Sequence, residues 1–270
     1  MRFSIIIPTL NEERYIGDLL KCLSTQTFRN FEVLIIDAKS RDRTKDVVLK
    51  YEESLNIRFI ESPKKSISYQ RNLGAKLSSY DDLIFFDADV TIEPQFINKV
   101  MEHIKKNNPD LLCCWFNPIS KRVDDKFYFQ MTNSYLEAVK KISPRGGGAF
   151  MYIKKKPFFN IGGFPEDIVL GEDYELVRRM NKEGYKYSLI KDPRINVSVR
   201  RFDKQGRIPY IINILFADLL VLLKGPIKDN RVIKYEFGNF NEEILSKNRK
   251  KNKMNKREKT AKNISWKKIK

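Results

Sequence analysis

The first half of the chain alternates short apolar runs with segments whose apolar residues recur at helical spacing. The run "FEVLIID", residues 31–37, is apolar at nearly every position, which is typical of a strand buried on both faces of a sheet. Similar apolar runs lie at 3–8, 57–62, 83–87 and 111–116. Helical patterns follow the first four runs, at 11–23, 42–53, 68–77 and 94–106. This alternation predicts an α/β fold in which helices flank a mixed, mostly parallel sheet.

The second half of the chain is less regular. The stretch "DKFYFQMTNSYLEAV", residues 125–139, has the pattern of an amphipathic helix. The stretch "PRGGGAFMYI" predicts a glycine-rich turn that enters a strand. The remaining predicted elements are a helix at 171–184 and strands at 185–190 and 195–202.

Polar side chains collect where four of the predicted strands end. These residues are Thr9, Asn11, Glu12, Asp37, Ser66, Asp87 and Asp89. In an open parallel sheet, ligands bind in the crevice beyond the carboxyl ends of the strands. Loop carboxylates at that edge are more often functional than carboxylates on helix surfaces. The sequence therefore predicts a ligand site at this edge of the sheet.

The stretch "LIFFDADV", residues 83–90, places two carboxylates directly after a buried strand. Asp87 and Asp89 offer hard oxygen ligands of the kind that Mg²⁺ or Mn²⁺ binds, with phosphate oxygens and water completing the shell. The pair could therefore hold a divalent ion against a diphosphate. Short acidic triplets are common, and the alternative is that Asp87 caps the following turn.

The stretch "GEDYELVRRM" places Glu172 and Asp173 at the start of a predicted helix. A general base that takes a proton from an attacking hydroxyl is one role for such a carboxylate. The alternative is a capping role, because the helix dipole favours negative charge at its amino end.

The stretch "RGGGAF" includes Gly147 and Gly148, which would let the backbone approach a ligand closely. A tight turn without a ligand is an equal alternative. The stretch lacks the Gly-Lys-Ser/Thr of a phosphate-binding Walker loop, and no G-x-G-x-x-G follows the first strand. A dinucleotide site is therefore disfavoured.

Histidine and cysteine chemistry has little support in this sequence. His103 is the single histidine and lies in a helical pattern, so a Ser-His or Cys-His mechanism lacks its partners. The three cysteines, Cys22, Cys113 and Cys114, lie in apolar segments and predict buried free thiols in a reducing compartment.

The formal charge of +18 is concentrated at the end of the chain. Residues 247–270 hold twelve Lys or Arg and one acid, a net charge of +11, which leaves +7 for residues 1–246. We expect 246–270 to be a disordered polybasic tail that is drawn to anionic lipid or nucleic acid, or that serves only solubility.

The longest late apolar run is "IPYIINILFADLLVLL", residues 208–223. It is interrupted by Pro209, Asn213 and Asp218 and is shorter than the roughly 20 residues that span a bilayer. With basic residues on both sides, it suits an amphipathic helix lying in a membrane interface. The alternative is a helix that packs on the rest of the chain or on a second subunit, as in a homodimer.

Six motifs in order resemble family 2 glycosyltransferases of the GT-A fold, over roughly residues 3–205. They are "SIIIPTLNEERYI", "FEVLIIDAKSRDRT", "SISYQRNLGA", "LIFFDADV", "GGGAFMYIKKKPFFNIGGFPE" and "GEDYELVRRM". The resemblance implies a GT-A domain at 1–205. The helical appendage, at 206–245, and the tail, at 246–270, are expected after it from their apolar and charge patterns. The resemblance further implies an inverting, metal-dependent enzyme that moves a sugar from a nucleotide diphosphate, UDP or GDP, to a hydroxyl acceptor.

The resemblance assigns roles to residues by their place in these motifs. The nucleotide-sugar pocket would be lined by Pro8, Thr9, Asn11, Glu12, Asp37, Arg71 and Asp87. Asp89 would be the principal ligand of Mg²⁺ or Mn²⁺, with Asp87 beside it. Asp173 would be the base, Glu172 would orient the acceptor, and Gly147 and Gly148 would border the acceptor cleft.

Two departures from the family pattern bear on substrate and product. Ala38 and Lys39 stand where the family usually has Asp or Asn followed by Gly, in the loop that reads the base. The Gln-x-x-Arg-Trp motif of processive members is missing, and "RRFDKQGR", residues 200–207, stands in its place. The second departure favours the addition of one sugar, with Arg200 or Arg201 as a possible diphosphate contact.

We expect a cytoplasmic enzyme at the inner face of the cell membrane, acting on a lipid-linked or cell-surface glycan precursor. The opening run is broken by Pro8 and is too short for the core of a signal peptide. A nucleotidyltransferase is one competing class, but its glycine- and Lys/Arg-rich loop is absent after the first strand. A nucleic-acid-binding protein is another, but its basic residues would be spread over the fold rather than confined to a tail.

Overall fold

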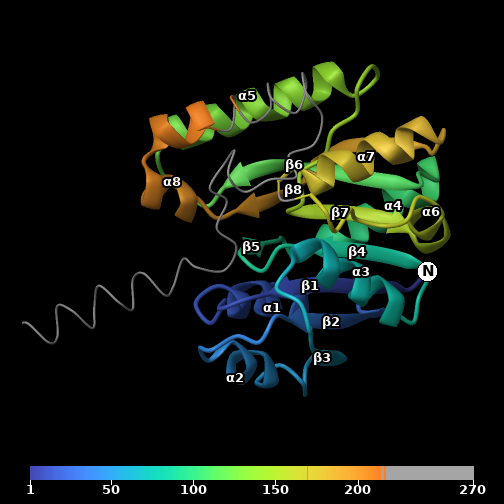
Figure 1. Ribbon diagram of the computed structural model, residues 1–270, viewed down its shortest axis with the longest axis vertical. Coiled ribbons are helices and arrows are strands. Elements are labelled where there is room, and N and C mark those ends of the chain that lie inside the picture. The colour runs from blue at the N-terminus through green and yellow to red at the C-terminus, as the bar shows by residue number, and fades with distance from the viewer. Residues whose placement is uncertain (169, 214–215, 217–270) are drawn as a thin grey trace, which may run out of the picture. The chain divides into compact units, whose positions relative to one another are not determined.

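The computed structural model describes residues 1–168, 170–213 and 216, and these residues contain one eight-stranded sheet flanked by helices (Figure 1). The strands are β1 (Phe3–Thr9), β2 (Phe31–Asp37), β3 (Ile57–Glu61), β4 (Asp82–Phe86), β5 (Val90–Thr91), β6 (Leu111–Pro118), β7 (Phe150–Lys154) and β8 (Tyr187–Val197). The helices are α1 (Ile16–Ser24), α2 (Thr44–Leu49), α3 (Ile67–Leu77), α4 (Phe96–Asn107), α5 (Val123–Val139), α6 (Lys155–Asn160), α7 (Glu172–Lys182) and α8 (Arg200–Gln205).

The strand order is β3-β2-β1-β4-β7-β6-β8-β5. The first four strands in this order run parallel to one another, and β6 runs parallel to β8. β7 is antiparallel to both of its neighbours, and β5 is antiparallel to β8. The predicted mixed, mostly parallel sheet is therefore confirmed.

The strand order reverses direction at β1, which lies between β2 and β4. The chain passes from β1 through β2 to β3 at one end of the sheet, and α3 then connects β3 back to β4 on the other side of β1. Because strand connections of this kind are right-handed, the reversal places α3 on the face of the sheet opposite α1 and α2. The carboxyl ends of β1, β2 and β4 lie next to one another at this switch point, where open α/β sheets bind ligands.

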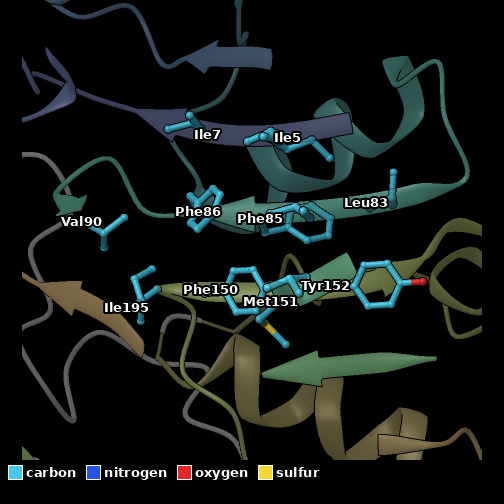
Figure 2. Packing of buried hydrophobic residues seen from close by; sticks show 14 of the residues in the cluster. Ile5, Ile7, Leu83, Phe85, Phe86, Val90, Phe150, Met151, Tyr152 and Ile195 are labelled. Atoms are coloured by element: carbon cyan, nitrogen blue, oxygen red, sulfur yellow. The ribbon is translucent and has the colours of Figure 1, made fainter. Parts of the chain in front are cut away.

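The core explains why these strands read as continuous apolar runs. Every residue of β1 and β2 is buried, and so are the last four residues of β4. Figure 2 shows Phe85 and Phe86 of β4 beside Phe150 and Met151 of β7. The Phe86 and Phe150 ring centroids lie 5.4 Å apart, and such aromatic pairs add to the stabilisation from area burial.

Three predictions about local structure were wrong in part. The strand predicted at 195–202 ends at Val197, and Arg200–Gln205 forms α8 instead. The first helix begins at Ile16 rather than at residue 11, because residues 11–15 form a loop at the site edge. Cys113 and Cys114 are buried free thiols as predicted, but Cys22 is only half-buried.

The appendage predicted at 206–245 falls within the described residues only at 206–213 and 216, where 207–213 are helical. The predicted tail, 246–270, lies outside the described residues. Across the described part of the chain, none of the helices combines the length and apolar character needed to cross a membrane.

Gly74 generates a test of how tightly α3 packs on the sheet. A Cβ atom at this position would lie 2.4 Å from Ile6 Cγ2 and 3.2 Å from Ile36 Cγ1, both in the buried faces of β1 and β2. We expect Gly74→Ala to lower the free energy of unfolding by about 1–3 kcal/mol, because the core must be overpacked. Urea unfolding with Lys76→Ala, an exposed site on the same helix, provides the control. Equal stability of the two variants would contradict this packing.

Candidate active site

The side chains at the carboxyl ends of β1 and β2 form a hydrogen-bonded group around Asp37. Thr9 and Asp37 lie opposite each other in the parallel register, and Thr9 Oγ1 donates to Asp37 Oδ1 at 2.8 Å. Ser40 donates from its amide to Oδ2 at 2.7 Å and from its hydroxyl to Oδ1 at 2.6 Å. Pro8 precedes Thr9 in the buried end of β1. The Asp37 carboxylate is thereby held in one orientation at the carboxyl end of β2.

The loops that follow β1 and β2 are joined to each other. The Asn11 amide donates to Ser40 Oγ at 2.8 Å, and the Arg41 amide donates to Asn11 Oδ1 at 2.9 Å. Asn11 and Lys39 both have left-handed backbone conformations, with φ of 56° and 60°. Lys39 thus keeps the backbone conformation that suits glycine, although it stands where the resembled family has glycine.

Arg71 of α3 lies between two carboxylates and is only 1% exposed. Its Nη2 donates to Asp87 Oδ1 at 2.7 Å and to the Gly148 carbonyl at 3.2 Å, and its Nη1 donates to Glu172 Oε1 at 3.0 Å. Burial lowers the pKa of Arg71, but Asp87 and Glu172 outweigh burial and raise it above the ordinary value. Contact between Arg71 and a diphosphate or ribose stays a prediction.

Asp173, at the start of α7, is held by two backbone amides. The Gly148 amide donates to its Oδ2 at 2.7 Å, and the Tyr174 amide donates to its Oδ1 at 2.9 Å. Burial, followed by the negative charge of Glu172, raises the pKa of Asp173 to about 7. A carboxyl group with such a pKa can accept a proton near neutral pH, as a general base must.

The two glycines before β7 are needed for close approach. A Cβ atom on Gly147 would lie 2.6 Å from Phe116 Cζ, and one on Gly148 would lie 2.7 Å from Arg71 Nη2. The glycine-rich stretch therefore packs against the site itself, because a side chain at either position would collide with its neighbour.

Arg200 connects the start of α8 to the loop that follows β1. It forms two hydrogen bonds to the Glu12 carboxylate, at 2.7 and 2.9 Å, and its Nε lies 2.9 Å from Asp89 Oδ2. Its guanidinium also lies over the Tyr15 ring, 4.6 Å from the centroid. Burial raises the pKa values of Glu12 and Asp89, and the Arg200 charge opposes that rise.

The carboxylates after β4 fit a divalent cation in number and type. Mg²⁺ and Mn²⁺ sites of nucleotide enzymes use one or two protein carboxylates and take their other ligands from phosphate and water. Asp87 and Asp89 supply two such groups, each already beside one arginine. Within residues 1–168, 170–213 and 216, no cluster of three or more His, Cys, Asp or Glu side chains could hold a metal ion. A cation held by these two carboxylates would take its other ligands from phosphate oxygens and water.

The structure brings the predicted site residues into three groups at one edge of the sheet. The groups are Thr9, Asn11 and Asp37 with Ser40; Arg71, Asp87, Gly148, Glu172 and Asp173; and Glu12 and Asp89 with Arg200. Ser66, by contrast, caps α3 by accepting a hydrogen bond from the Tyr69 amide. His103 lies on α4, where its Nε2 is 2.8 Å from Ser188 Oγ.

Sequence reasoning missed two supporting residues. Ser40 gave no signal beyond its place in the loop after Asp37. Gln70 donates to the Thr9 carbonyl at 2.9 Å and so fixes the end of β1. The helical spacing of residues 67–77 could have indicated that Gln70 faces the sheet and is buried there.

Family comparison identifies the fold and the reaction class. The sequence model described as "Glycosyl transferase family 2" matches residues 4–163, more than half of the chain. The chain belongs to glycosyl transferase family 2. The resemblance seen in its motifs is confirmed, and the protein is a glycosyltransferase.

Curated relatives of this glycosyltransferase match most of its length. A dolichyl N-acetyl-alpha-D-glucosaminyl phosphate 3-beta-D-2,3-diacetamido-2,3-dideoxy-beta-D-glucuronosyltransferase of Methanococcus voltae is 30% identical over 231 residues, 75% of this chain and 70% of that protein. The poly(ribitol-phosphate) beta-N-acetylglucosaminyltransferase TarS of Staphylococcus aureus is 24% identical over 232 residues, 83% of this chain and 40% of TarS.

Solved structures share the fold of this glycosyltransferase. A TarS fragment in complex with UDP-GlcNAc superimposes with a TM-score of 0.61 at 22% identity, covering 73% of this chain and 58% of that one. The mannosyltransferase PcManGT of Pyrobaculum calidifontis, in complex with GDP-Man and Mn²⁺, gives a TM-score of 0.65 at 20% identity, with 82% and 62% covered. This chain spans less than two thirds of either structure, and at these identities the likeness shows the fold.

The raised pKa of Asp173 predicts a pH-dependent stability. The unfolded Asp173 loses its proton near pH 4, whereas the folded one keeps it until about pH 7, so folded protein binds the extra proton between these values. The stabilisation that the protonated Asp173 adds to the free energy of unfolding is present below about pH 4 and is lost as the pH rises through 7. We expect wild type to lose more unfolding free energy between pH 5 and 8 than Asp173→Asn, as measured by urea unfolding. Parallel losses in the two proteins would contradict the raised pKa.

Proposed function

We propose that this enzyme transfers a single sugar, with inversion, from a UDP- or GDP-linked donor to a hydroxyl of a lipid-linked or cell-surface glycan precursor. One observation carries the proposal. Arg71 joins Asp87 on the donor side to Glu172, next to Asp173, on the acceptor side, within one buried network. A donor in the crevice would thus lie beside a carboxylate that can act as a base.

The donor half would be held by the ends of β1, β2 and β4. Asp37, fixed by Thr9 and Ser40, would accept hydrogen bonds from the nucleobase. Pro8, Asn11 and Glu12 line the same crevice in this proposal. Complexes of structural relatives with UDP-GlcNAc and with GDP-Man support a nucleotide-sugar donor of either kind.

A divalent ion, Mg²⁺ or Mn²⁺, held by Asp89 with Asp87 beside it, would offset the negative charge of the leaving diphosphate. The PcManGT complex with Mn²⁺ supports such an ion in this fold. Arg200 now stands beside Asp89 and Glu12. The Arg200 guanidinium would place a second positive charge beside the diphosphate. The diphosphate would then replace Glu12 and Asp89 as a partner of Arg200 in part of its contacts.

The chemistry of this chain centres on Asp173. Its carboxylate would take the proton of the acceptor hydroxyl while the hydroxyl oxygen bonds to the anomeric carbon. The bond from that carbon to the phosphate oxygen would break in the same step, and the nucleotide diphosphate would leave with the electron pair. The two backbone amides keep the Asp173 oxygens oriented, and burial, followed by the charge of Glu172, raises the pKa of Asp173. One displacement inverts the configuration, and no covalent enzyme intermediate is required.

The names of two relatives support an acceptor that carries phosphate. One acts on a dolichyl-linked glucosaminyl phosphate and the other on poly(ribitol-phosphate). A lipid-linked acceptor would bring the enzyme to the inner face of the cell membrane as a peripheral protein. Exposed Ile208, Ile212 and Phe216 at the start of the predicted interfacial helix support this placement. A dimer contact through the same residues is the alternative.

A screen of nucleotide sugars tests the role of Asp173. We expect Asp173→Asn to bind UDP- or GDP-sugar as wild type does and to lose about 10²- to 10⁴-fold in transfer rate, because a general base is removed. Donor binding is measured by isothermal titration and transfer by release of nucleotide in the presence of acceptor extract. Full transfer by this variant would remove Asp173 from the base role.

The same screen tests Asp89 on the donor side. We expect Asp89→Ala to lose turnover with every donor, including slow donor hydrolysis without acceptor, because the diphosphate charge is no longer offset. Asp192→Ala, which removes an exposed carboxylate paired with Lys99, is the matched control. Unchanged hydrolysis by Asp89→Ala would contradict the metal-ligand role.

A further inference from the structure

A cavity of about 650 Å³ lies between α5 and the carboxyl-terminal parts of β6 and β8. Its wall includes aromatic, amide and cationic side chains, among them Phe116, Asn117, Lys126, Phe127, Arg194 and Asn196. The roles proposed above for donor and base use none of these residues. The amide and cationic side chains could bind a polar headgroup, and the aromatic side chains could pack against a sugar ring.

The cavity adjoins the site through two of its wall residues. Phe116 packs directly under Gly147, and the next residue, Gly148, donates its amide to Asp173. Asn196 pairs in register with Thr91 of β5, two residues beyond Asp89. The wall of the cavity is therefore linked through Phe116 to the glycines that hold the proposed base, and through Asn196 to the strand that follows the proposed metal ligand.

The charge of the wall selects for an anion. Lys126 and Arg194 are cationic, and no Asp or Glu is among the described residues that line the cavity. Arg194 is held in place, because its Nη1 donates to Asn117 Oδ1 at 3.3 Å and its guanidinium lies over the Trp115 ring at 5.0 Å. Guanidinium and ammonium groups are the side-chain groups that bind phosphate oxygens.

The mouth of the cavity is apolar. Val123 and Phe127 line it and are also 80% and 67% exposed, and Met131 lies one turn further along the exposed face of α5. Large exposed apolar side chains in a row on one helix mark a surface that meets another apolar body. A ligand with an anionic polar end and a hydrocarbon chain matches the interior and the mouth together.

We infer that this cavity is the acceptor subsite, and that it takes the phosphate-bearing headgroup of an amphiphilic acceptor whose hydrocarbon part runs along Val123, Phe127 and Met131. The inference rests on the proposed function, since it names where that acceptor binds. Lys126 and Arg194 bind the phosphate, and Phe116 places the sugar beside Gly147 and Asp173.

The two tryptophans of the chain allow a direct binding test. Trp115 stacks with Arg194, so the Trp266→Phe protein reports on the cavity through Trp115 fluorescence. The probes, kept below their micellar concentrations, are dodecyl phosphate, dodecyl maltoside and inorganic phosphate. We expect saturable binding of dodecyl phosphate, with an affinity about tenfold or more above those of the neutral amphiphile and the free ion.

Lys126→Met should weaken dodecyl phosphate binding about tenfold, because it removes one charged contact from a solvent-exposed side chain without disturbing the fold. Lys182→Met, an exposed lysine of α7 outside the cavity, is the matched control and should bind as wild type does. Equal binding by both variants, or equal affinity for dodecyl maltoside and dodecyl phosphate, would overturn the inference.

Titration of UDP and GDP with Mn²⁺ separates this inference from the proposed function. Lys126→Met should bind nucleotide as wild type does, because the donor crevice is untouched. If wild type bound neither nucleotide but still bound dodecyl phosphate through Lys126, the proposed function would fail and the anionic amphiphile site would stand. If it bound nucleotide but dodecyl phosphate left Trp115 unchanged, the acceptor subsite would be overturned.

Discussion

The site depends on one buried cation, the guanidinium of Arg71. A charge that is removed from water is tolerated only when carboxylates and carbonyls surround it, and loss of one partner of such a pair costs about 3–5 kcal/mol. Arg71 finds these partners in Asp87 after β4 and Glu172 at the start of α7, which lie 16 and 101 residues away along the chain. The two halves of the fold are therefore held together at the point where donor and acceptor would meet.

The same network sets the protonation of the proposed base. Glu172 contacts Arg71 and also lies next to Asp173, so its charge partly cancels the effect of the guanidinium on that carboxyl group. Burial then raises the pKa of Asp173 toward neutrality, while two backbone amides keep its oxygens oriented. In the proposed mechanism, one set of contacts would therefore orient Asp173 and set its protonation.

Arg200 repeats this arrangement on the donor side. It holds Glu12 and Asp89 together and so places the start of α8 over the loop that follows β1. A nucleotide diphosphate brings negative charge to the same place and would compete with these carboxylates for Arg200. Beyond the catalytic sheet, Arg207 pairs with the buried Asp125 of α5, so the following helical segment is tied to the wall of the proposed acceptor cavity.

Much of the fold could be predicted because the parallel strands are buried on both faces. β1 and β2 carry apolar residues at most positions, apart from the hydrogen-bonded pair Ser4 and Glu32, and end in the polar residues Thr9 and Asp37. The family motifs then supplied roles for Arg71, Asp89 and Asp173. The contacts of Arg200 could not be predicted, because pairing across 188 residues leaves no local pattern. The alternation at 195–202 likewise gave no sign that the strand stops at Val197 and turns into α8.

The proposed function depends most on the acidic residues at the carboxyl ends of the strands. The most direct measurement is a crystal structure of the protein with Mn²⁺ and UDP or GDP. We expect the nucleobase at Asp37, the metal on Asp89 and the diphosphate within reach of Arg200, with Arg71 still joining Asp87 to Glu172. A nucleotide bound elsewhere, with Asp89 still paired only to Arg200, would contradict the proposed function.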